Sequence, residues 1–164
     1  PSLVGSEMCI RDRDWSNRVN ELIGRLPSLG AFENVHSTLK HAHHDADIVI
    51  VSSANLQAVE TEWTEHHLTS FLTSIFAQEV GTKKHCIQQL KQHYKPDHIL
   101  VLGDARGDLQ AAQDNQVYFY PILAGNEATS WSNLDQTYLK LFINNQFDNT
   151  IQDRVIQQFY NNFD

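Results

Sequence analysis

Between His98 and Asp108 the sequence reads HILVLGDARGD. The run from His98 to Leu102 is almost entirely aliphatic and does not alternate with polar residues. This pattern is typical of a strand that is covered on both faces of a parallel sheet. A glycine and an aspartate end the run, and a helix is predicted to follow from about Gly107 to Asn115. The segment therefore predicts one buried strand and one helix joined by a short polar loop.

The same strand-then-helix order recurs on both sides of this segment. Further strands are predicted at Asp47–Val51 (DIVIV), at Leu72–Ala77 and at Val117–Ile122, where Pro121 indicates the margin of the sheet. Helices are predicted at 15–26, 35–44, 56–67 and 82–94, and several more after Trp131. Short loops between strands and helices predict an α/β fold with a Rossmann-like, doubly wound parallel sheet. Such sheets bind ligands beyond the carboxyl ends of their strands.

Composition narrows the class of protein. The chain has 164 residues, 12 Lys and Arg against 20 Asp and Glu, and a formal net charge of -8. An acidic chain is a poor partner for nucleic acid, which needs a basic face. No run of apolar residues is long enough to span a membrane, and two cysteines do not make a disulfide framework. We expect a cytoplasmic protein of one domain, without a nucleic-acid or membrane partner; its oligomeric state cannot be read from the sequence.

Two carboxylates flank the turn that follows the 98–102 strand. Asp104 and Asp108 are four residues apart, so they fall on the same turn at a strand end. Oxygen ligands of this kind suit Mg²⁺, which needs one or two carboxylates and completes its shell with water and phosphate oxygens. The alternative is that both residues only cap the following helix.

Polar groups that suit a phosphoryl group occur at two further places. Ser52 and Ser53 follow the 47–51 strand, where a hydroxyl and backbone N–H groups could bind a phosphoryl oxygen; the alternative is a helix N-cap. Lys83 begins a helix, a position that disfavours a cation unless it answers a negative charge. Its neighbour Lys84 could take that role instead, or both could be surface lysines.

These pieces, in this order, resemble the haloacid dehalogenase (HAD) superfamily. The family's motifs are a Ser or Thr after a strand, then a Lys, then GDxxxD after another strand, and VIVSSAN, EVGTKKH and LVLGDARGDLQAA match them over about Ala31–Gly125. The resemblance implies Mg²⁺-dependent hydrolysis of a small phosphorylated metabolite through an aspartyl-phosphate. It implies that Asp104 binds Mg²⁺, that Asp108 orients it, and that Ser52 and Lys83 hold the phosphoryl oxygens.

The family's first motif, DxDxT after an apolar strand, has no convincing match. Asp12 and Asp14 fit D-x-D on paper, but residues 1–13 have no helical or strand period and resemble a translated sequencing adaptor. We therefore expect 1–13 to be a non-native scar, 14–30 to be the remnant of a helical cap domain, and 31–164 to be a core that lacks its first strand and its nucleophile. Such a chain should be inactive as a phosphatase.

Other classes of protein explain less of the sequence. A dehydrogenase would carry G-x-G-x-x-G after a strand, and none is present. A zinc site usually combines His and Cys ligands from spaced positions. The candidates here are the HAHH and His66–His67 histidines and Cys86, and the place of Cys86 on an apolar helix stripe is explained by core packing. A noncatalytic HAD-like or receiver-like binding module, which needs no nucleophile, stays open as the alternative.

Overall fold

The computed structural model describes residues 2–5 and 34–163. In this part of the chain, parallel strands alternate with helices, which confirms the α/β class. The strands are β1 (Ser2–Gly5), β2 (Asp47–Val51), β3 (Ser74–Phe76), β4 (Ile99–Gly103) and β5 (Tyr118–Pro121). The helices are α2 (Val35–Asp45), α3 (Leu56–Glu65), α4 (Lys83–Leu90), α5 (Arg106–Asn115), α6 (Glu127–Asn133), α7 (Leu139–Ile143) and α8 (Asn149–Asn161), with a π-helical turn η4 (Leu134–Tyr138) between α6 and α7. The helix predicted at 15–26 lies outside the described residues.

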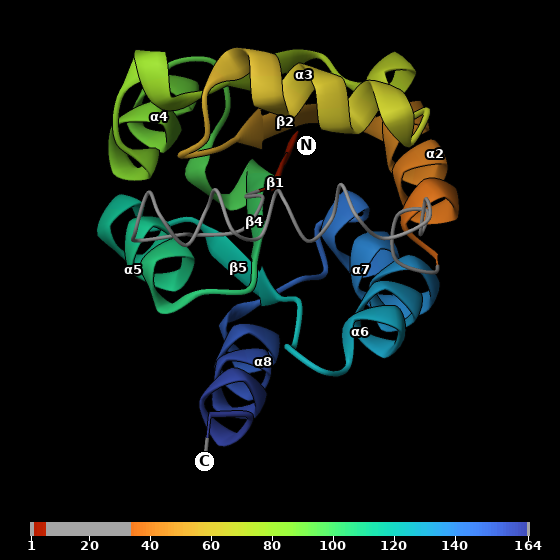
Figure 1. Cartoon of the computed structure of the whole chain (residues 1–164). Helices are drawn as coiled ribbons and strands as arrows, with labels where there is room; N and C mark the ends of the chain where they lie inside the picture. Colours follow the sequence, from red (N-terminus) through yellow and green to blue (C-terminus); the bar gives the residue numbers. More distant parts are fainter. Residues whose placement is uncertain (1, 6–33, 164) are drawn as a thin grey trace.

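The strands form one sheet in the order β3-β2-β1-β4-β5, and every neighbouring pair is parallel. Parallel neighbours need long crossovers, and the helices provide them (Figure 1). All carboxyl ends therefore meet at one edge of the sheet. That edge is where the residues singled out in the sequence must be sought.

The position of β1 corrects one expectation. We expected no strand in residues 1–13, whereas the backbone of Ser2–Gly5 pairs with both β2 and β4 at the centre of the sheet. That residues 31–164 lack a first strand of their own stays a prediction. The N–H and C=O groups that face this position on β2 and β4 need partners, and any extended segment can supply them. Four residues are too few for periodicity to reveal a strand. The adaptor origin of the segment stays a prediction.

Alternate strand residues pack into two separate apolar clusters. One cluster contains Ile48 and Ile50 of β2 with Leu100 and Leu102 of β4. The other contains the alternate residues of the same strands, such as Val49 and Val101. Helices α2, α3 and α7 contribute buried residues to the first cluster, whereas α4 and α5 lie side by side over the second (Figure 1). Full burial of such side chains stabilises the fold by about 1.5 to 3 kcal/mol each, which explains why these strands are apolar on both faces.

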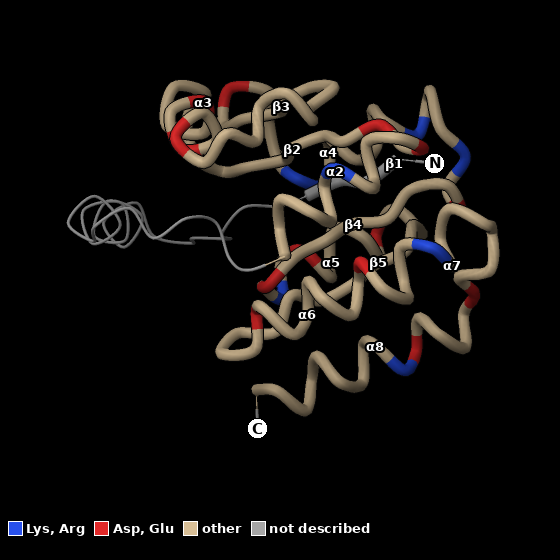
Figure 2. The backbone as a smooth tube through the Cα atoms, turned by 90° about the vertical axis from the view of Figure 1, so that its right-hand side faces the viewer, with Lys and Arg blue, Asp and Glu red and all other residues tan. Residues whose placement is uncertain are grey.

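Apart from Asp47 at the start of β2, the charged residues of the described chain lie on the helices and loops around the strands (Figure 2). Strand β4 carries no charge at all, and its five residues are buried. None of the helices in the described parts of the chain is long and apolar enough to cross a membrane.

Strand β5 is an edge strand, as Pro121 indicated, and its outer edge is covered. The side-chain amide of Gln152 on α8 accepts a hydrogen bond from the N–H of Phe119 (2.6 Å) and donates one to its C=O (2.7 Å). Pro121 has no N–H, and the N–H of Leu123 donates to the hydroxyl of Ser130 (2.9 Å). The side chain of Gln152, the proline and the hydroxyl of Ser130 thus leave few backbone groups at this edge for another strand to pair with.

Replacing Gln152 with alanine should destabilise the chain by about 1 to 3 kcal/mol, because the variant loses both hydrogen bonds at Phe119. Urea unfolding of the variant and the parent measures this difference. Gln157→Ala is the matched control, since Gln157 makes only a surface contact to Asn161 on the same helix, and it should change stability by less than about 0.5 kcal/mol. Equal effects of the two substitutions would contradict the role given to Gln152.

Candidate functional site

The register of the sheet sets Ser52 and Asp104 level with each other. Gly5 pairs with Ile50 on one side and with Leu102 on the other. The residues two positions further along β2 and β4 are therefore at equal height, at the carboxyl edge and on either side of β1. Two strand spacings separate their backbones by about 10 Å. The fold thus brings both residues to one edge, facing the end of the central strand.

Ser52 is fixed at the end of β2. Only 3% of its surface is exposed; its N–H donates to the C=O of Phe76 (2.9 Å), and its Oγ accepts from the N–H of Ala54 (3.1 Å). It does not cap the next helix, because Asn55 does so through its side-chain oxygen (2.8 Å to the N–H of Ala58). A hydroxyl that accepts one hydrogen bond still has its own hydrogen to donate. The neighbouring Ser53 is exposed.

Lys83 and Asp108 form the central ion pair of the site. Lys83 Nζ lies 2.5 Å from Asp108 Oδ1, and their side chains are 13% and 0% exposed. Thr82 caps α4 by accepting a hydrogen bond from the N–H of His85 (3.2 Å), which places Lys83 on the first turn of that helix. The ammonium of Lys83 is therefore paired with a buried carboxylate. The pairing explains why a cation is found at a helix start, where the helix dipole disfavours it.

Asp108 also caps its own helix. Its Oδ2 accepts a hydrogen bond from the N–H of Ala105 (3.2 Å), at the start of α5. The helix-cap interpretation thus describes part of what Asp108 does, and the contact with Lys83 describes the rest. Asp104 is half-buried in the loop between β4 and α5.

Lys84 points elsewhere. Its side chain is 61% exposed, and its Nζ lies 3.6 Å from Asp114 Oδ2. Of the two adjacent lysines, Lys83 is therefore the one in contact with the GDARGD segment.

The oxygen ligands that the sequence assigned to Mg²⁺ differ in what they already bind. Both carboxylate oxygens of Asp108 accept hydrogen bonds from protein groups, so this residue suits an orienting role better than a direct ligand. Asp104 offers the ligand type that Mg²⁺ prefers, and one or two protein carboxylates suffice for that ion. Within the described residues, no group of three or more His, Cys, Asp or Glu side chains is arranged to hold a metal. A cation at this edge would be held mainly by Asp104, and water or a ligand oxygen would have to complete its shell.

Gly103 permits the close approach of Asp108 to the strand end. A Cβ atom at position 103 would lie 2.4 Å from Asp108 Cβ and 2.5 Å from its Oδ2. Such distances are too short for non-bonded atoms, and the fully buried Asp108 has no room to move away. The glycine of the motif is thus explained by packing.

Gly103→Ala should lower stability by about 1 to 3 kcal/mol through this overlap and should disturb the contact between Lys83 and Asp108. Urea unfolding measures the first effect, and the amide chemical shifts of Ala105 and Asp108 report the second. Gly125→Ala provides a comparison with open space around the new Cβ but a positive φ of 83°, so its cost should be one of backbone strain, with those two shifts unchanged. A Gly103→Ala variant that unfolds like the parent would contradict the packing argument.

The other candidate metal ligands have different partners. His41 Nδ1 lies 2.6 Å from Asp135 Oδ1 on η4, and the rings of His36 and His43 lie edge-on to Phe71. Cys86 is fully buried in the core, as its place on the apolar stripe predicted, and burial raises the pKa of its thiol.

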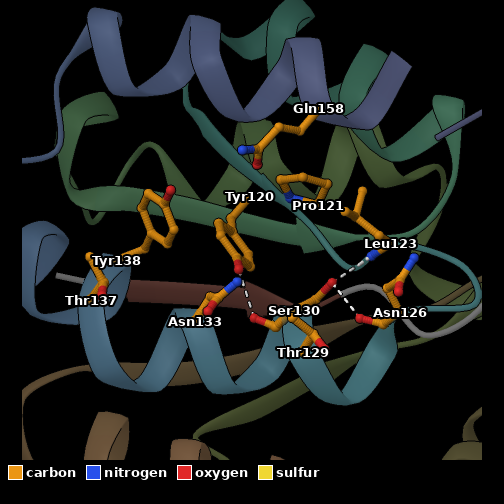
Figure 3. Close-up of a pocket in the computed structure, with 10 residues that line it drawn as sticks. All are labelled: Tyr120, Pro121, Leu123, Asn126, Thr129, Ser130, Asn133, Thr137, Tyr138 and Gln158. Carbon is orange, nitrogen blue, oxygen red and sulfur yellow. Dashed lines mark hydrogen bonds between the residues drawn. The ribbon is translucent and has the colours of Figure 1, made fainter. Parts of the chain in front are cut away.

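A pocket that the sequence did not suggest lies beside β5. It has a volume of about 320 Å³ and is lined by residues of β5, α6, η4 and α8 (Figure 3). Tyr120 forms part of it and donates a hydrogen bond to the C=O of Ser130 (2.6 Å); burial, and to a lesser extent Tyr138, raises the pKa of its phenol. The lining is uncharged, and it includes none of the four motif residues. It is therefore a poor site for a phosphate.

No protein-family model matches the chain. A search of curated protein sequences finds no match either. Among solved structures, the chain is similar to the crystal structure of a HAD-superfamily hydrolase of subfamily IA, variant 1, from Geobacter sulfurreducens, with a TM-score of 0.56 and 11% sequence identity. The match covers 73% of this chain and 88% of that one. The α/β fold of this chain is therefore HAD-like.

Proposed function

We propose that this chain belongs to a Mg²⁺-dependent phosphate-monoester hydrolase of the HAD superfamily, with a doubly wound sheet as its core. Its substrate is a small phosphorylated metabolite, and the reaction passes through an aspartyl-phosphate in the complete enzyme. The observation that carries this proposal is the contact of Lys83 with Asp108, together with the register that sets Ser52 and Asp104 at equal height on either side of β1. This arrangement supports the proposal because the three segments are far apart in the sequence.

Each residue has a role that follows from its surroundings. Ser52 donates its hydroxyl hydrogen to a phosphoryl oxygen, and the ammonium of Lys83 offsets the negative charge that the phosphoryl group carries. Asp104 holds the cation, and Asp108 keeps Lys83 and the start of α5 in place. When bound, Mg²⁺ supplies charge neutralisation at the phosphoryl oxygens.

We propose further that the chain does not turn over substrate by itself, because no Asp-x-Asp pair directly follows one of the predicted apolar strands. Asp12 and Asp14 lie outside the described residues. An assay with Mg²⁺ and an aryl phosphate should give no turnover above that of the buffer. Turnover that Asp14→Asn abolishes would overturn this proposal and would identify Asp14 as part of the reaction.

Binding can be tested without turnover. Titration of ¹⁵N-labelled protein with Mg²⁺, and then with inorganic phosphate, should shift the amide signals of residues 103–108 and of Ser52. Asp104→Asn should weaken Mg²⁺ binding at least about tenfold, and Asp114→Asn, a change at an exposed carboxylate near the end of the following helix α5, should leave it within about twofold. Identical affinities in the two variants would contradict the site.

The two hydrogen bonds of Asp108 favour the noncatalytic alternative. Asp108 is fully engaged with protein groups and so can serve structure alone. A binding module of this kind would bind Mg²⁺ without phosphate, or neither. In the phosphatase lineage, Mg²⁺ should increase the affinity for phosphate. Comparing the phosphate affinity measured with and without Mg²⁺ therefore separates the two functions.

A further inference from the structure

Arg106, in the middle of the GDARGD segment, contacts the far end of the described chain. Its guanidinium carbon lies 4.7 Å from the centre of the Phe163 ring, which is a cation–π distance. Arg106 is the first residue of α5, where the helix dipole disfavours a cation. The negative face of an aromatic ring partly offsets this cost. The contact therefore connects the segment that carries Asp104 to the residues that follow α8.

Phe163 is itself anchored to the sheet through aromatic rings. Its ring lies edge-on to that of Phe159 at 4.9 Å, and the buried Phe159 packs edge-on against Phe119 of β5 at 5.3 Å. Beside it, the side-chain amide of Asn162 donates a hydrogen bond to the C=O of Ala124 in the loop after β5 (3.1 Å). The residues that follow α8 thus contact both the first residue of α5 and the loop after β5.

The first turn of α5 is held on two sides. Arg106 and Asp108 are two positions apart on a helix, so their side chains leave it in nearly opposite directions. Lys83 contacts Asp108 on one side, and Phe163 contacts Arg106 on the other. A turn that is held on both sides keeps the preceding Asp104 loop in one conformation.

We propose that Phe163 is a positioning residue for the Asp104 loop, acting through Arg106. The role for ligand binding depends on the function proposed above, whereas the ordering of the loop does not. Loss of the aromatic ring leaves Arg106 without its offsetting partner at the helix start, and the loop opens more often. An exposed contact of this kind corresponds to a change of about two- to fivefold in the equilibrium between the ordered and the open loop.

Hydrogen exchange of the full chain tests the ordering of the loop without any ligand. In Phe163→Leu, the amides of residues 105–108 should exchange about two to five times faster than in the parent, and Phe163→Trp should restore the parent rate because tryptophan offers a stronger cation–π face. Tyr160→Leu is the matched control: Tyr160 is 43% exposed against 45% for Phe163, and its ring contacts Phe159 at 6.1 Å. It should leave these amides unchanged.

A titration of the same variants with Mg²⁺ tests the consequence for binding, with a loss of about two- to fivefold expected for Phe163→Leu. Faster exchange in Phe163→Leu without any Mg²⁺ binding in the parent would keep the positioning role and refute the metal site. Equal exchange in Phe163→Leu and Tyr160→Leu, or no rescue by tryptophan, would overturn the positioning role, whatever Mg²⁺ does.

Discussion

Replacing Lys83 with methionine is expected to lower the free energy of unfolding by about 3 to 5 kcal/mol, because it leaves the carboxylate of Asp108 buried without its cation. Asp108 has no exposed surface, and Lys83 Nζ lies 2.5 Å from it. Methionine keeps most of the length and apolar volume of lysine, so the loss reports on charge rather than on a cavity. Urea unfolding at pH 7 measures it.

Two further variants make this result specific. Lys84→Met removes the neighbouring lysine, whose surface contact with Asp114 spans 3.6 Å, and should cost at most about 1 kcal/mol. Adding Asp108→Asn to Lys83→Met removes the uncompensated charge and should recover part of the stability. A Lys83→Met protein as stable as Lys84→Met would show that the ion pair contributes little to the fold.

Val4→Pro should have a comparable effect, a loss of about 3 kcal/mol or more, because β1 is paired on both sides and proline removes a backbone donor from the middle of the sheet. A loss of that size is a large part of the stability of a typical domain, so far-UV circular dichroism and urea unfolding should show a partly unfolded chain. Val4→Ile keeps the N–H and the branched side chain and should cost less than about 1.5 kcal/mol. If the proline variant unfolds like the parent, Ser2–Gly5 does not fill the central position.

The sequence predicted the parts of the fold that local patterns control. Continuous apolar runs gave β2, β4 and β5 within about two residues of their bounds, and the capping side chain of Thr82 marked the start of α4. Strand β1 could not be predicted, since four residues owe their conformation to the strands on either side. Helix α4 ends at Leu90 and not at Tyr94, whose hydroxyl instead donates to Asp47 at the start of β2.

The site was predictable to a similar extent. The order of Ser52, Lys83 and GDARGD indicated which residues to examine, and parallel topology explains why they meet at one edge. The sequence could not distinguish a helix cap from a ligand at Ser52, which required the observation that Asn55 caps α3. The contact between Arg106 and Phe163 joins segments that no local pattern relates, and only the packing of α8 brings them together.

The covering of β5 by α8 has a consequence for how the protein is made. Gln152 is 33 residues later in the chain than Phe119, the residue whose backbone it binds. During translation, β5 leaves the ribosome well before α8, and its outer row of N–H and C=O groups then faces water or other nascent chains. Chaperone binding, or aggregation on crowded polysomes, should therefore be greatest in the interval between the emergence of the strand and that of the helix.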